Sequence, residues 1–386
     1  MKTIIRSTGM GFLLAGVFAV GGMNAYAQNP CEDYDGNAAL DATIRENYPK
    51  DDTKPAAIKA AKEYIEKYGS CEAFKDFAEW LKPQVPKWEE KVAFNEAAKW
   101  LTPRFKSFDD AINASNWEQV YTVGGEILGK YTPGQVDKVT GFDSIDQAVT
   151  LGLAGLAASY SNNMNYNDRA LSNAKTALNL LKGGVKSTQK TGNFGVLKFG
   201  RTREDAISEL TYAIGYINYW DKKDKKSAVA SFYEVTQLPG AFKTQPAVYS
   251  TIGDFYRDEA SVIAKELAEL SKKLNASTVE EEKVQLDAQI KDKEALFNGY
   301  AERAMDAYGR AHNLASDKTP EGKKYKEGLF TTISGLYEMR FQKKDGINTW
   351  LTTATAKPLP NPTTDVEPIK DPEPTPTSGA TAVSKP

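Results

Sequence analysis

The sequence predicts an all-α fold. Between residues 28 and 356, apolar side chains recur at three- and four-residue spacing, and hardly any stretch alternates apolar with polar residues as a strand would. Prolines and Pro-Gly pairs interrupt this pattern at intervals, which is typical of turns between helices. We therefore expect a series of helices joined by short connections.

The N-terminal part of the chain, residues 28–135, is expected to contain six short helices. They cover residues 38–47, 54–68, 71–81, 88–101, 105–114 and 117–130. Pro83, Pro86 and Pro103 should end helices, because proline lacks an amide donor and its ring clashes with the preceding turn. Pro133-Gly134 closes this part of the chain.

The beginning of the chain has the order of a secretory signal peptide. Lys2 and Arg6 precede an apolar run at residues 10–23, and Ala25-Tyr26-Ala27 supplies a small-x-small cleavage site. We expect residues 1–27 to be removed and the protein to work in the periplasm or outside the cell. An uncleaved anchor is the alternative, but it needs about 20 apolar residues, and this run is shorter and contains four glycines.

Charge argues against a nucleic-acid partner. Loss of Lys2 and Arg6 with the signal leaves 47 basic residues against 51 acidic ones, a net charge of about −4. A chain without a basic excess does not attract a polyanion. We also expect no membrane span after signal cleavage.

Both cysteines, Cys31 and Cys71, survive signal cleavage and should meet an oxidising compartment. We expect them to form a disulfide. The chain-entropy estimate for such a loop gives a stabilisation of roughly 4 kcal/mol. Two free thiols, or pairing between chains, are the alternatives.

One helix carries a pattern with a specific meaning. Tyr249, Ile252 and Tyr256 share a face, and Gly253 leaves room for a second helix to approach. This spacing resembles the first helix of a tetratricopeptide repeat, a family of stacked helical hairpins. Similar patterns elsewhere are Trp117-x2-Val120-x3-Gly124, Leu153-x2-Leu156-Ala157-x2-Tyr160, Ala170-x3-Ala174-x2-Ala177, Ile214-Gly215, Ala228-x3-Phe232-x2-Val235, Ala304-x3-Tyr308-x2-Ala311 and Phe330-x2-Ile333-Ser334-x2-Tyr337 with Gly346-x3-Trp350. The resemblance implies an irregular solenoid over residues 136–356, because the strict 34-residue period is not kept.

An insertion lengthens one hairpin of this solenoid. In a standard repeat the aromatic of the second helix follows Tyr249 by 20 residues, whereas Tyr308 follows it by 59. The inserted residues have the four-three apolar spacing of a coiled coil. They are Ile263, Leu267, Leu270 and Leu274 on the way out, and Leu286, Ile290, Phe297 and Ala301 on the way back. We expect a projecting antiparallel hairpin over about residues 254–313.

The C-terminal residues 357–386 contain eight of the 18 prolines and no aromatic residue. A segment of this composition cannot build a core. The sequence therefore predicts a disordered tail that the fold does not need.

No pattern of catalytic, cofactor-binding or metal-binding residues accompanies these helices. The chain has one histidine, His312, and two cysteines, which cannot supply a tetrahedral zinc set. The resemblance instead implies a non-catalytic scaffold whose first helices line a groove for a protein or peptide partner. The family's groove positions fall on Ser250, Asp254 and Arg257 in one helix, and on Thr331, Gly335 and Glu338 in another.

Two other functions stay open. A secreted α/α-toroid enzyme acting on carbohydrates would also be helical and aromatic-rich, but it needs two carboxylates beside a glycosidic bond, and 51 acidic residues always offer pairs. A structural component of the cell envelope could self-associate through the hairpin and the tail. A basic stretch at residues 183–203 could contact an anionic partner, or it could be a solvated loop.

Overall fold

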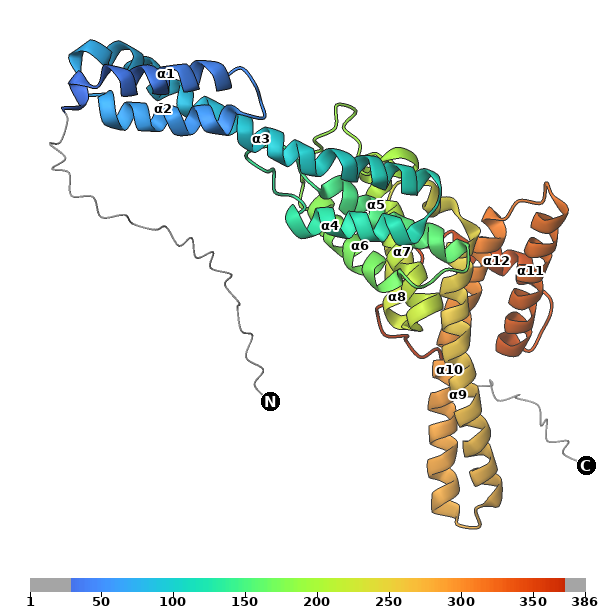
Figure 1. The fold of residues 1–386 in the computed structure, drawn as a ribbon. Coiled ribbons are helices and arrows are strands. Elements are labelled where there is room, and N and C mark those ends of the chain that lie inside the picture. Colours follow the sequence, from blue (N-terminus) through green and yellow to red (C-terminus); the bar gives the residue numbers. More distant parts are fainter. Residues whose placement is uncertain (1–28, 372–386) are drawn as a thin grey trace, which may run out of the picture. The chain divides into compact units, whose positions relative to one another are not determined.

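The structure is a computed structural model that describes residues 29–371 (Figure 1). These residues form twelve α-helices and one isolated β-bridge, between Phe194 and Arg201, and no strand. The all-α prediction is confirmed. The chain divides into two compact units between Ala98 and Lys99. The predicted signal peptide and residues 372–386 of the predicted tail lie outside the described residues.

The first unit contains α1 (Tyr34–Asn47), α2 (Lys54–Tyr68) and the first part of α3 (Lys75–Asn113). Its core joins all three helices through Ile44, Tyr64, Tyr68, Leu81 and Val85, together with three alanines. The predicted disulfide between Cys31 and Cys71 is present, with the two Cα atoms 5.1 Å apart. It ties the segment before α1 to the segment after α2.

Helix α3 differs from the prediction. The three helices expected over residues 71–81, 88–101 and 105–114 form one continuous helix, and Pro83, Pro86 and Pro103 lie inside it. Each internal proline costs roughly 3 kcal/mol. Buried side chains flank each proline, including Leu81 and Leu101, and their burial favours continuation of the helix across the prolines. Helix α3 also passes through the division between the two compact units.

The second unit consists of the end of α3 and nine further helices. They are α4 (Trp117–Lys130), α5 (Ile145–Tyr160), α6 (Asn167–Lys182), α7 (Arg203–Ile217), α8 (Lys225–Gln237), α9 (Pro246–Ala276), α10 (Glu280–Leu314), α11 (Pro320–Phe341) and α12 (Ile347–Thr355). Helix α5 packs on α6, α7 on α8 and α9 on α10, and each pair also contacts the next one. This is a helical repeat-like arrangement.

Glycines mark the contact inside each of these pairs. A Cβ atom on Gly152 of α5 would lie 2.9 Å from the backbone of Ala174 in α6. Gly215 faces the ring of Phe232 in the same way, and Gly253 faces the ring of Tyr308. A Cβ atom on Gly155 of α5 would lie 2.1 Å from the Cβ of Ala170 in α6. The close contacts in α5 are therefore at Gly152 and Gly155, and not at Ala157, the small residue of the sequence pattern.

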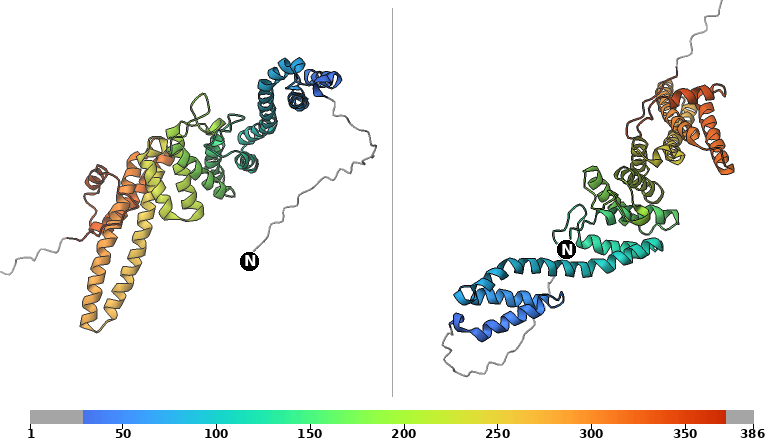
Figure 2. Two further views of the ribbon diagram at one scale, coloured as in Figure 1. Left: turned by 90° about the vertical axis from the view of Figure 1, so that its left-hand side faces the viewer. Right: turned by 90° about the horizontal axis from the view of Figure 1, so that it is seen from above.

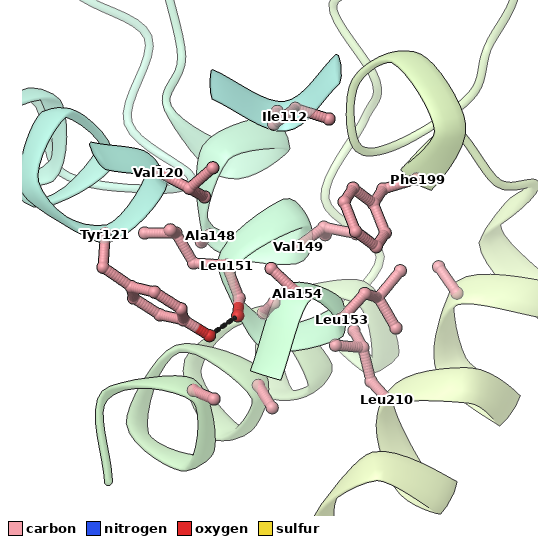
Figure 3. Close-up of a cluster of buried hydrophobic side chains, with 14 of the residues drawn as sticks. Ile112, Val120, Tyr121, Ala148, Val149, Leu151, Leu153, Ala154, Phe199 and Leu210 are labelled. Atoms are coloured by element: carbon pink, nitrogen blue, oxygen red, sulfur yellow. Dashed lines mark hydrogen bonds between the residues drawn. The ribbon is translucent and has the colours of Figure 1, made fainter. Parts of the chain in front are cut away.

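Helix α4 shares one hydrophobic core with α5, α6 and α7. The Tyr121 hydroxyl donates a hydrogen bond of 2.7 Å to the carbonyl of Leu151 in α5 (Figure 3). Around this bond lie the buried side chains of Val120, Ala148 and Ala154. Gly124 of α4 leaves room for Leu151 and for Phe108 of α3.

Helices α9 and α10 form the predicted long antiparallel hairpin. In Figure 1 and in the left view of Figure 2, their distal halves run side by side beyond the other helices of the second unit. Ser277 holds the turn between the two helices, because its hydroxyl accepts from the Val279 amide (3.2 Å) and donates to Glu282 (2.6 Å).

Residues 357–371 are not the disordered tail that the composition predicts. They run along α10, where the amide of Ile369 donates to the carbonyl of Ala295 (2.7 Å) and Asn298 donates to the carbonyl of Ile369 (3.1 Å). Arg303 donates to the carbonyls of three residues, Asn361, Thr364 and Asp365. A segment without aromatic residues is thus held by backbone hydrogen bonds and by burial of Leu359.

Candidate functional site

The three predicted groove residues of α9 lie together on one stripe of that helix. Asp254 accepts a hydrogen bond of 2.6 Å from the hydroxyl of Tyr308 in α10, and its carboxylate lies 3.0 Å from the guanidinium of Arg257. Ser250 accepts a hydrogen bond of 3.0 Å from the hydroxyl of Tyr325 in α11. Three helices therefore meet at this stripe through side-chain hydrogen bonds.

The stripe keeps polar groups accessible to solvent. The side chains of Arg257 and Asp254 are 46% and 37% exposed, and Tyr325 is 40% exposed. Asp254 is held in place by Tyr308, while Arg257 pairs with the exposed carboxylate of Asp254 and its guanidinium lies 5.9 Å from the centre of the Tyr308 ring. An exposed ion pair of this kind contributes little to stability, so exchange of the Asp254 carboxylate for a ligand carboxylate would cost Arg257 little.

Aromatic rings from the preceding hairpin border this stripe. Tyr219, which follows α7, is half-buried, and burial raises its pKa, as does the negative charge of Asp254. The ammonium of Lys225 in α8 lies 5.7 Å from the centre of the Tyr219 ring and 2.5 Å from the carboxylate of Asp258. The carboxylates of α9 and the ring of Tyr219 thus face each other across the boundary between two hairpins.

More rings continue the surface toward α5. Tyr216 of α7 stacks on Trp220 with centroids 4.6 Å apart, and Tyr160 of α5 meets Tyr216 edge-on at 5.2 Å. Trp220 in turn contacts Tyr219. We call the combined set the α7–α9 surface. It comprises Tyr216, Tyr219, Ser250, Asp254, Arg257 and Tyr325.

The three residues predicted on α11 do not join this surface. Thr331 lines a hollow whose other residues, His312 and Phe330 among them, come from α10, α11 and the segment between them, and none from α9. Gly335 is exposed with open space around it, and Glu338 is exposed and pairs with Lys344 at 3.5 Å. In α11 it is Tyr325, not these residues, that reaches α9.

The basic stretch at residues 183–203 is largely engaged in internal contacts. Phe194 and Phe199 are buried, and the amide of Gly195 donates to the carboxylate of Asp146 in α5 (2.9 Å). Arg203 donates to the carbonyl of Leu181 (2.7 Å) and to that of Val185, and Arg201 pairs with Glu209 at 2.6 Å. These arginines stabilise the loop itself, which favours the interpretation of a structural loop.

Residues 29–371 contain no group of three or more histidine, cysteine or carboxylate side chains placed to hold a metal ion. Within the same residues, each helix is too short or too polar to cross a membrane.

No protein-family model matches the chain, and no curated protein and no solved structure matches it either.

Sequence patterns missed half of the α7–α9 surface. Tyr219 lies just beyond α7, where the pattern did not define the helix face, and Tyr325 lies in the first turns of α11, before the aromatic motif at residues 330–337. The available signal was the grouping of Tyr216, Tyr219 and Trp220 within five residues.

Proposed function

We propose that this protein is an exported, non-catalytic scaffold of tetratricopeptide-like hairpins that binds a protein or peptide partner on the α7–α9 surface. The observation that carries the proposal is the meeting of accessible charges and rings from successive hairpins around Asp254 and Arg257. Repeat scaffolds use the same design, in which each repeat adds a few side chains to one extended surface.

The chemistry of the surface suits a peptide. Arg257 provides a guanidinium fork for a carboxylate or a backbone carbonyl. Tyr216 and Tyr219 provide ring faces for apolar side chains, at low cost in side-chain entropy. The disulfide between Cys31 and Cys71 supports export, since such bonds persist in oxidising compartments.

The test is capture of partners from an envelope extract by the mature protein and by matched variants. We expect Arg257→Glu combined with Tyr219→Ala to lose a captured protein that the wild type retains. Lys175→Glu, an exposed lysine on the second helix of its hairpin, is the control and should retain it. Asp254 is left unchanged because it holds Tyr308.

All variants should still unfold in one cooperative transition, with a modest loss of stability in the double variant because the Tyr219 ring packs against the core. Retention of every captured protein by the double variant would refute the proposal. Loss of all of them by the Lys175→Glu control would also count against it.

A further inference from the structure

The distal arms of the α9–α10 hairpin, residues 264–294, leave their apolar seam partly uncovered. Leu286 is buried, but the other four seam residues are only half-buried. They are Leu267, Leu270, Leu274 and Ile290. Two helices bury each other's seam from one side, so the flanks of the seam stay open to solvent. A third helix along one flank would bury these side chains more completely.

One flank of the seam forms a groove of about 430 Å³ between the two arms. Leu270 of α9 lines this groove, together with Gln289 of α10, three lysines and two glutamates. The groove lies on the part of the hairpin that extends beyond the other helices of the second unit (Figure 1). It is therefore accessible to a partner.

The charges that line the groove are not balanced. Both glutamates already have a lysine partner, since Glu266 pairs with Lys293 at 2.5 Å and Glu269 pairs with Lys272 at 2.6 Å. The other two lysines that line the groove, Lys265 and Lys273, are exposed and form no ion pair with any residue between 29 and 371. The groove thus presents two ammonium groups that a partner can neutralise.

The spacing of these two lysines fits a helical partner. Lys265 and Lys273 are eight residues apart on α9, which corresponds to about 12 Å along the helix. On a second helix, residues seven apart share one face and lie about 10 Å from each other. A helix with an apolar stripe for Leu270 and a carboxylate in each heptad therefore matches the groove in shape and in charge.

A second copy of the arms does not match the groove in charge. A two-fold axis across the groove would bring Lys265 of one copy against Lys273 of the other, and an axis along the groove would bring each lysine against itself. Either arrangement places like charges together. We propose that the groove binds an acidic amphipathic helix of a different protein and so completes a three-helix coiled coil.

Titration with a designed peptide tests the proposal. The probe is a fluorescent peptide of four heptads with leucine at positions a and d and glutamate at positions e and g, whose own glutamates disfavour self-pairing. Its binding to the full protein is followed by anisotropy at low ionic strength. We expect saturable binding that weakens as salt is added, because salt screens the lysine–glutamate pairs.

Variants of the arms locate the binding. Lys265→Glu combined with Lys273→Glu should weaken binding of the acidic peptide about tenfold or more, because two attractions become repulsions. Replacement of residues 267–292 by a short Gly-Ser turn should abolish binding. The matched control is Lys175→Glu combined with Lys226→Glu, which reverses two exposed lysines of α6 and α8 and should leave the affinity unchanged.

A charge swap separates a lost contact from a disturbed fold. A second peptide with lysine in place of every glutamate should bind the Lys265→Glu and Lys273→Glu double variant more tightly than it binds the wild type. A variant whose arms had lost their structure would bind neither peptide. Circular dichroism should show the same helix content in this variant as in the wild type.

Four results would overturn the proposal. They are no saturable binding of the acidic peptide, an affinity that the double variant leaves unchanged, equal binding of both peptides to the wild type, and a protein that sediments as a dimer until Leu270 is replaced by alanine. The last result would mean that a second copy occupies the groove. Because the groove shares no residue with the α7–α9 surface, each of these results would leave the proposed capture of a partner on that surface standing.

Discussion

The base and the distal arms of the α9–α10 hairpin belong to the same two helices, but they are stabilised differently. In the base, residues 248–263 and 295–311, buried side chains recur at nearly every turn. In the arms, residues 264–294, only Leu286 is buried. Helical structure therefore continues well past the point where the core ends, because each arm needs only the other arm as a neighbour.

Local interactions hold the arms together. Lys293 of α10 reaches Glu266 of α9 at 2.5 Å, and pairs within one helix include Lys272 with Glu269 and Lys291 with Asp287. Exposed ion pairs of this kind contribute little to stability, because water and salt screen them. The arms should therefore open far more readily than the base.

The largest effect is expected from Tyr308→Ala in the base. The ring of Tyr308 fills the space over Gly253 and its hydroxyl donates to Asp254, so truncation leaves a cavity and an unpaired acceptor. We expect urea unfolding to show a loss of about 3–5 kcal/mol. Tyr308→Phe, which keeps the ring, should lose only about 1 kcal/mol. Equal losses for the two variants would show that the ring does not carry the packing.

A smaller loss is expected when the C-terminal segment is removed from the base. Truncation after Ala356 deletes the buried Leu359 and the hydrogen bonds to Asn298 and Arg303. We expect a loss of about 2 kcal/mol in the unfolding free energy. Truncation after Asp371 is the control and should change nothing measurable. If truncation after Ala356 also left the unfolding free energy unchanged, the fold would not need residues 357–371, as their composition predicts.

The smallest effect is expected from removal of the arms. Replacement of residues 267–292 by a short Gly-Ser turn keeps Lys293 beside Glu266 and every contact of the base. We expect the unfolding free energy to change by less than about 1 kcal/mol, since little buried surface is lost and a short loop replaces the old turn. A fall of several kcal/mol in the unfolding free energy would show that the arms stabilise the rest of the second unit.

Sequence patterns predicted the hairpin because the feature is local. Its insertion, the four-three spacing of its apolar residues and the small residue at Gly253 are all readable along one helix. The features that could not be predicted depend on distant partners. Helix α3 continues through its prolines because buried residues flank them. Residues 357–371 are ordered by carbonyls that face Arg303, a contact that composition does not reveal.

The candidate site could be predicted only in part, for the same reason. Asp254 and Arg257 could be assigned because the Gly253 motif defines which face of α9 packs on α10 and which face is free. In α11 the aromatic motif at residues 330–337 was the guide to which face of the helix is free. This assignment placed Thr331 and Glu338 in the groove. The residue that reaches α9 is Tyr325, whose role depends on the hydroxyl of Ser250 in another helix.

Hydrogen exchange along α9 and α10 tests the contrast between base and arms most directly. Amides around Tyr256 and Tyr308 should exchange only when the packed helices of the second unit open, which is rare. Amides around Leu274 and Leu286 should exchange by local opening of the arms. We expect protection in the arms to be lower by about two orders of magnitude or more. Equal protection in both regions would contradict the account and would show that the arms are stabilised as strongly as the base.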